Sequence, residues 1–113
     1  MDALDFNVRL APRETVRILD QEIVNGSMTG ERIDWYSVED GAGHVCIVAV
    51  YEKHYYRAGN RLTLTVCVEN LRGITHVHAA GGGGGEGLFR FDWGAASSFT
   101  NSAYEVLSDY VID

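Results

Sequence analysis

The clearest pattern in this chain is an alternation of apolar and mostly polar residues between Arg61 and Glu69. The apolar positions are Leu62, Leu64, Val66 and Val68. A period of two predicts a β-strand with one face against a core and the other toward solvent. A second such segment, residues 74–80, carries His76 and His78 two positions apart, so both point to the same side. The short Leu71-Arg72-Gly73 segment between them predicts an antiparallel pair.

The same reading extends to the rest of the chain. Alternation or β-branched and aromatic content between glycine-containing turns predicts strands at 3–10, 31–39, 44–56, 60–70, 74–80 and 87–93. A helix is expected from Pro12, which suits a first helical turn, to about Gly26. A second helix is expected after Trp93-Gly94, where the apolar period becomes helical again.

The resulting order, β-α-β-β-β-β-β-α, predicts an α+β fold. Each helix has one apolar face. Packing both helices on the same face of a sheet buries both apolar faces in a two-layer fold. We therefore expect a single two-layer domain over residues 1–113, with a curved antiparallel sheet of five to six strands and two helices on one face. A length of 113 residues fits one domain.

Composition narrows the classes of function. The formal net charge is −7 and the basic residues form no stripe, which argues against nucleic acid as a partner. The longest apolar run, Val45–Tyr51, is too short to span a membrane. The first twenty residues lack the apolar segment of an export signal, so a cytoplasmic location and reduced cysteines are expected.

Candidate chemistry lies on the polar side of the sheet. If Leu71-Arg72 is a two-residue turn, Cys67 pairs with His76 and Thr65 with His78. A similar turn before residue 60 sets Val50 beside Cys67. One face then carries the candidate ligand or metal residues Glu52, His54, Cys67, His76 and His78.

These residue types permit two interpretations. Histidine, cysteine and carboxylate are metal ligands and acid–base groups, and Cys67 beside a histidine could act as a nucleophile. The plainer interpretation is a half-exposed sheet face on which polar residues alternate. No C-x-x-C or H-E-x-x-H spacing is present. We therefore assign no catalytic residue, predict no cofactor, and lean toward a protein that is not an enzyme.

The same register makes two further predictions. It sets Cys46 four residues from the position opposite Cys67, roughly 13 Å by strand rise, which is beyond disulfide reach. The two cysteines are therefore expected to be free thiols. The glycine run at 81–85 leads into a strand and not a helix, so it is interpreted as a hairpin connection that tolerates substitution, not a phosphate-binding loop.

Apolar residues are also expected on the face away from the helices. Val48 and Val50 would lie there, with Trp35 and Ile33 beside them on the neighbouring strand. A strand that is apolar on both faces is normally covered on both. Two helices suffice for one side, so we expect a homodimer with two-fold symmetry on the other.

Three short segments resemble a family of small uncharacterised bacterial proteins, a domain of unknown function. They are Asn25-Gly26-Ser27, Gly59-Asn60-Arg61-Leu62-Thr63-Leu64 and His76-Val77-His78-Ala79-Ala80-Gly81-Gly82. The resemblance covers nearly the whole chain and implies a bacterial cytoplasmic origin, without assigning a role to any residue. The element order also resembles the helix-grip fold, which implies a cavity for a small ligand.

Three functions follow as hypotheses. The first is a non-enzymatic binding module that associates with itself through the open sheet face or a sheet edge. The second is a small-molecule-binding protein with a cavity between the sheet and the helices. The third is a metal- or cysteine-dependent enzyme that uses the face of His76 and His78.

Overall fold

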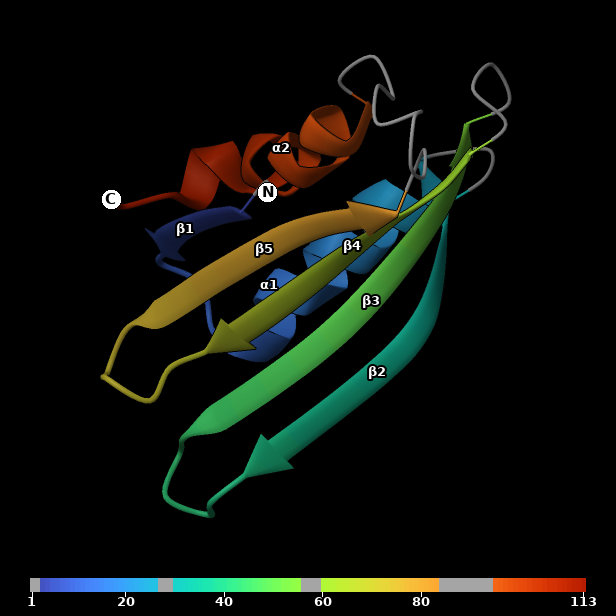
Figure 1. Ribbon diagram of the computed structural model, residues 1–113. Coiled ribbons are helices and arrows are strands. Elements are labelled where there is room, and N and C mark those ends of the chain that lie inside the picture. The colour runs from blue at the N-terminus through green and yellow to red at the C-terminus, as the bar shows by residue number, and fades with distance from the viewer. Residues whose placement is uncertain (1–2, 27–29, 56–59, 84–94) are drawn as a thin grey trace.

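A computed structural model of the chain describes residues 3–26, 30–55, 60–83 and 95–113 (Figure 1). The strands are β1 (Ala3–Val8), β2 (Glu31–Glu39), β3 (Val45–Tyr55), β4 (Asn60–Glu69) and β5 (Thr75–Gly83). The helices are α1 (Pro12–Leu19), its π-helical continuation η1 (Asp20–Asn25), α2 (Ala95–Leu107) and the short 3₁₀ segment η2 (Ser108–Tyr110). The predicted strand at 87–93 lies outside the described residues.

The five strands form one antiparallel sheet in the order β1-β5-β4-β3-β2. Both helices lie on the same face of this curved sheet, α1 over its centre and α2 over β5, β4 and β1 (Figure 1). The predicted α+β fold, with two helices on one face of an antiparallel sheet, is confirmed. The chain order does not reveal that β1 and β2 form the two edges of the sheet. The helix α1 connects these two strands from one edge to the other, and β1 pairs with β5.

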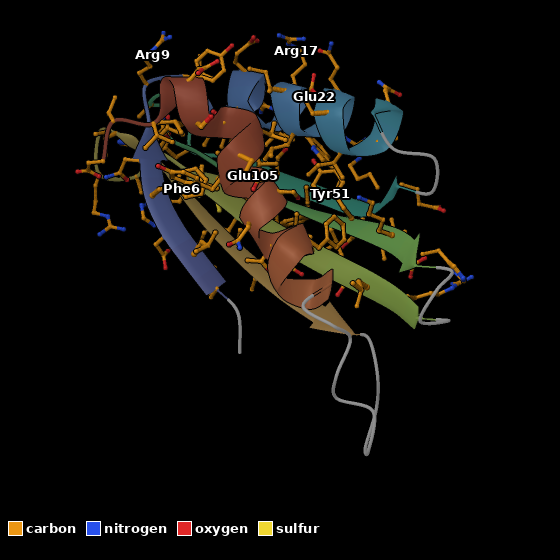
Figure 2. All side chains as sticks on the ribbon, turned by 90° about the horizontal axis from the view of Figure 1, so that it is seen from above. Phe6, Arg9, Arg17, Glu22, Tyr51 and Glu105 are labelled. Carbon is orange, nitrogen blue, oxygen red and sulfur yellow. The ribbon has the colours of Figure 1, made fainter. Side chains whose placement is uncertain are left out.

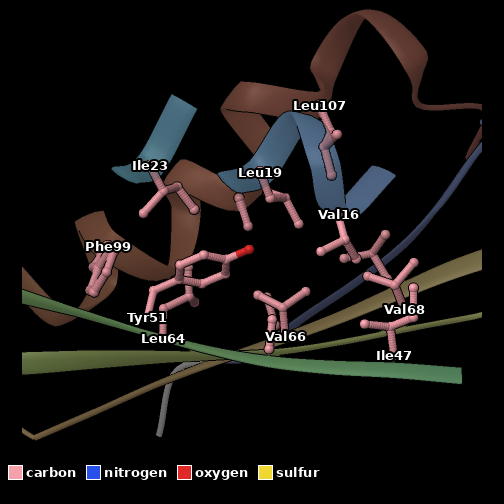
Figure 3. Packing of buried hydrophobic residues seen from close by; sticks show 14 of the residues in the cluster. Val16, Leu19, Ile23, Ile47, Tyr51, Leu64, Val66, Val68, Phe99 and Leu107 are labelled. Atoms are coloured by element: carbon pink, nitrogen blue, oxygen red, sulfur yellow. The ribbon is translucent and has the colours of Figure 1, made fainter. Parts of the chain in front are cut away.

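The core fills the space between the helices and the sheet (Figures 2 and 3). Its largest fully buried side chains are Tyr51, Phe99, Leu19, Ile47, Leu62, Leu64 and Leu107. Every second residue of β4, from Leu62 to Val68, is buried, as the alternation predicted. Burying each large apolar side chain contributes about 1.5–3 kcal/mol, so this face of the sheet supplies much of the driving force for folding.

The core also contains polar groups, among them the Tyr51 hydroxyl. The Tyr51 hydroxyl donates a hydrogen bond of 2.6 Å to Asp20, the first residue of η1, and Tyr51 itself is fully buried. The same carboxylate accepts a hydrogen bond of 2.7 Å from Arg32 on β2. Burial and the adjacent carboxylate raise the pKa of Tyr51, so the phenol keeps its proton and remains a donor. Asp20 thus joins the helix, the core and the edge strand.

The register differs from the predicted one. Cys67 pairs with His78, not His76, and Val48, not Val50, lies opposite Cys67. The β4–β5 connection is longer than two residues: Asn70 receives the Gly73 N–H through its carbonyl, and Gly73 has a φ of 88°. A shift of two residues preserves the side to which each side chain points, so the predicted faces of β3, β4 and β5 hold although the partners were wrong.

The glycine run also differs from its predicted role. Gly81, Gly82 and Gly83 belong to β5 and pair with Leu64, Thr63 and Leu62. Gly83 has a φ of 80°, and a Cβ there would lie 2.6 Å from the Arg61 carbonyl oxygen. Because the backbone approaches so closely, the prediction that residue 83 tolerates substitution is wrong.

Candidate functional site

All five candidate ligand residues lie on the outer face of the sheet, the side away from the helices. They form two separate groups, however. Cys67, His76 and His78 occupy adjacent positions on β4 and β5, whereas Glu52 and His54 lie toward the other end of β3. Four residues of β3 separate Glu52 from the position opposite Cys67, about 13 Å by strand rise. The structure does not bring the five residues into one site.

The two histidines converge on Asp5 of β1, which sequence reasoning did not single out. His76 Nε2 and His78 Nδ1 each lie 2.8 Å from Asp5 Oδ1. Hydrogen bonds from His76 and His78 lower the pKa of Asp5, which keeps it a carboxylate. The alternation in residues 3–10 was the available signal, but it could not reveal that β1 lies beside β5.

The second ring nitrogen of His76 is also engaged. His76 Nδ1 lies 2.7 Å from Asn7 Oδ1, and the Asn7 side-chain amide donates to Asp113. Both nitrogens of this ring therefore face oxygen atoms and none is directed at an open position. In the described part of the chain, no group of three or more His, Cys, Asp or Glu residues is arranged to hold a metal ion. The arrangement gives the metal hypothesis no support and ties β1, β5 and the C-terminal residue together.

The two cysteines are much closer than predicted. Cys46 Sγ and Cys67 Sγ are 3.8 Å apart, and both thiols are free. The error follows from the register, because Cys46 pairs with Glu69 and is a diagonal neighbour of Cys67. Burial, and then the nearby Cys46, raise the pKa of Cys67 to about 11. That shift is opposite to the one that activates a catalytic cysteine, so it argues against a nucleophile at this position.

Exposed hydrophobic side chains gather on β2. Of the eight large hydrophobic residues that are exposed in the described part of the chain, four are in this strand. They are Ile33, Trp35, Tyr36 and Val38. The predicted placement of Trp35 and Ile33 was wrong. Trp35 pairs with Ala49 and faces the helix side, and Ile33 lies in a bulge; Tyr36 and Val38 accompany Val48 on the outer face.

β2 is also an open edge. It is the last strand in the sheet order, and only β3 pairs with it in the residues that the structure describes. Backbone N–H and C=O groups along such an edge can pair with another strand. Edge-to-edge pairing is reduced, but not prevented, by a bulge between Arg32 and Asp34 and by the charged residues of the strand.

A groove of about 260 Å³ lies between α1 and β2. Its lining consists of Arg13, Val16, Arg17, Asp20, Arg32, Trp35 and Ile47. The arginines are held by carboxylates: Arg13 by Glu39, Arg17 by Glu14 at 2.5 Å, and Arg32 by Asp20 at 2.7 Å. The Arg32 guanidinium also lies 5.7 Å from the centre of the Trp35 ring. The groove therefore combines an aromatic surface with oriented cations.

Among the helices in the described ranges, none is both long and apolar enough to cross a membrane. The chain belongs to a family of unknown function, DUF6054, which it matches over residues 1–111. This confirms the resemblance to an uncharacterised family. No curated protein and no solved structure matches the chain.

Proposed function

For this member of a family of unknown function, we propose a non-enzymatic role in self-association, as a homodimer formed through the open edge of β2. The observation that carries the proposal is the concentration of half of the exposed large hydrophobic residues on this one edge strand. Covering these side chains removes apolar surface from water. This proposal differs from the sequence-based expectation, which set the interface on the outer face around Val48 and Val50.

The backbone of β2 favours an extended partner. The strand is nine residues long, and its free edge offers a row of donors and acceptors. A second β2, running antiparallel across a two-fold axis, satisfies these groups and joins two five-stranded sheets into one.

Charge complementarity favours a second copy as the partner. Counted by their partners on β3, Arg32 and Glu39 lie equally far from Tyr36, on opposite sides of it, because the bulge absorbs the extra residue. An antiparallel copy centred on Tyr36 therefore sets Arg32 opposite the partner subunit's Glu39, where each side chain adds a partner to the Asp20 or Arg13 that it already contacts within its own chain. It also brings the two Tyr36 side chains together on the outer face, where aromatic pairs stabilise neighbouring strands.

Sedimentation equilibrium tests this arrangement. At about 100 µM, where a dimer of micromolar Kd is nearly complete, the wild-type chain is expected to be a dimer. Tyr36→Lys is expected to be a monomer, since it places two like charges at the centre of the interface. Leu71→Lys is the matched control, because Leu71 is 58% exposed, close to the 62% of Tyr36, but lies in the β4–β5 turn. A monomeric wild type, or equal masses for the two variants, would contradict the proposal.

The groove between α1 and β2 supports a second candidate function, the binding of a small anionic aromatic molecule. A ligand carboxylate would compete with Asp20 or Glu14 for an arginine while its ring packs on Trp35. Titration with benzoate, followed by NMR chemical shifts of the Trp35 indole N–H, tests this function. Arg17→Gln is expected to weaken binding and Arg72→Gln, in the distant β4–β5 turn, to leave it unchanged. Absence of shifts at the indole, or equal effects of the two substitutions, would reject it.

A further inference from the structure

Cys46 and Cys67 form a pair of thiols on the outer face of the sheet. Cys46 comes from β3 and Cys67 from β4, and each is partly exposed. Their sulfur atoms are 3.8 Å apart, at contact distance. The pair lies on β3 and β4, and Cys46 is opposite Val38 of β2, so the pair adjoins the strand of the proposed dimer contact without being part of it.

A disulfide is within reach of this pair. Closing one requires the sulfurs to approach to about 2.05 Å. Diagonal neighbours on adjacent strands lie about 7–8 Å apart, so closure requires movement of the two strands as well as side-chain rotation. Both helices lie on the other face of the sheet (Figure 1), so a small reagent can approach from this side. We propose that Cys46 and Cys67 are a modification site that forms a reversible intramolecular disulfide between β3 and β4.

The oxidant class is a low-molecular-weight disulfide such as oxidised glutathione. One cysteine thiolate attacks a sulfur of this molecule, which gives a mixed disulfide and releases one small thiol. The second cysteine thiolate then attacks the protein sulfur of the mixed disulfide and releases the second small thiol. The protons of the two cysteines pass to the two released thiols. The protein is oxidised by two electrons and the small disulfide is reduced by two.

The surroundings make this exchange slow and selective. Cys46 has Glu69 of β4 opposite it on one side and Val38 of β2 on the other. Cys67 has His78 of β5 on one side and Val48 of β3 on the other. The raised pKa of Cys67 leaves little thiolate at neutral pH, so the exchange is expected to accelerate as the pH rises. The proposal therefore rests on the 3.8 Å contact between the two sulfur atoms and not on an activated thiol.

Intact-mass analysis tests the site. Reduced wild-type protein is held with excess oxidised glutathione under native conditions at mildly alkaline pH, acid-quenched, and then alkylated with N-ethylmaleimide in denaturant. The expected product is a single chain that has lost two hydrogens, with no alkylated thiol and no glutathione adduct. Cys46→Ser and Cys67→Ser are expected to stop at the mixed disulfide or at one alkylated thiol, which shows whether the reagent reaches the remaining cysteine.

Dithiothreitol is expected to restore two alkylated thiols in the oxidised wild type. Two alkylated thiols in the native wild type after glutathione treatment would overturn the proposal. So would a persistent glutathione adduct on the wild type, or a disulfide that links two chains. All three outcomes are read on the wild-type chain, so none depends on the folding of a variant, and the first two do not bear on the oligomeric state proposed for the β2 edge.

Discussion

Asp40 organises the turn between β2 and β3 through three contacts of one carboxylate. Its Oδ1 accepts the Ala42 N–H at 2.7 Å and the His44 N–H at 3.1 Å, and its Oδ2 lies 2.5 Å from His44 Nδ1. The hydrogen bond with the His44 ring, and then the one from Ala42, lower the pKa of Asp40 from 3.8 to about 2. All of these contacts favour the ionised form.

This pKa shift predicts a specific pH dependence. A carboxylate whose pKa is lower in the folded state stabilises the fold above its unfolded pKa, and the stabilisation is lost as the pH falls through its folded pKa. Asp40→Ala is therefore expected to lower Tm at pH 7, by an amount that shrinks as the pH falls from about 4 to about 2. Asp109→Ala, which removes the same charge outside the turn, is the control in thermal melts. An Asp40→Ala difference that stays constant across this range would show that the turn does not depend on the ionised carboxylate.

At the scale of the element, β3 shows how one strand serves two environments. Ile47, Ala49 and Tyr51 are buried beneath the helices, whereas Val48 and Val50 are only partly buried on the outer face. The sequence alone suggested that the outer set needs full cover. Val48 lies between Tyr36 of β2 and Cys67 of β4, which supply part of this cover. The side chains that remain exposed on this face include Tyr36 and Val38 of the edge strand.

The glycines at the end of β5 are expected to differ in their tolerance of a side chain. Gly83→Ala is expected to destabilise the fold by at least about 2 kcal/mol, because its φ is positive and the new Cβ would meet a backbone carbonyl. Gly82→Ala is the matched control: a Cβ there lies 3.2 Å from a single side-chain atom, Thr63 Oγ1, and its cost should be smaller. Urea unfolding of both variants measures the difference. Equal free energies of unfolding would mean that β5 does not pair as far as Gly83.

At the scale of the whole molecule, the net charge of −7 opposes contact between copies. Salt screens this repulsion, whereas single exposed ion pairs contribute little. The proposed dimer is therefore expected to tighten, with a lower Kd, between about 0.01 M and about 1 M sodium chloride. Sedimentation equilibrium across this range measures the Kd. A Kd that rises with salt would indicate that cross-subunit pairs such as Arg32 and Glu39 dominate the contact.

The sequence by itself determined the parts of this protein that depend on local periodicity. Alternation at Leu62, Leu64, Val66 and Val68 settled which side of β4 is buried, because side chains on a strand must point to opposite faces in turn. Turn residues and helical periods located the elements, and their order predicted an α+β fold with the helices on one face. Register slips of two residues leave the faces intact, so these predictions survived wrong pairing.

Only the tertiary structure decided what depends on non-local pairing. The contact of Cys46 with Cys67 required the true register, which a longer turn at Asn70 and Gly73 helps to set. Asp5 lies beside the two histidines because β1 pairs with β5, a strand about 70 residues later in the chain. The exposure of β2 required the full strand order. No local pattern encodes these relations, because residues far apart in sequence meet only when the whole sheet has assembled.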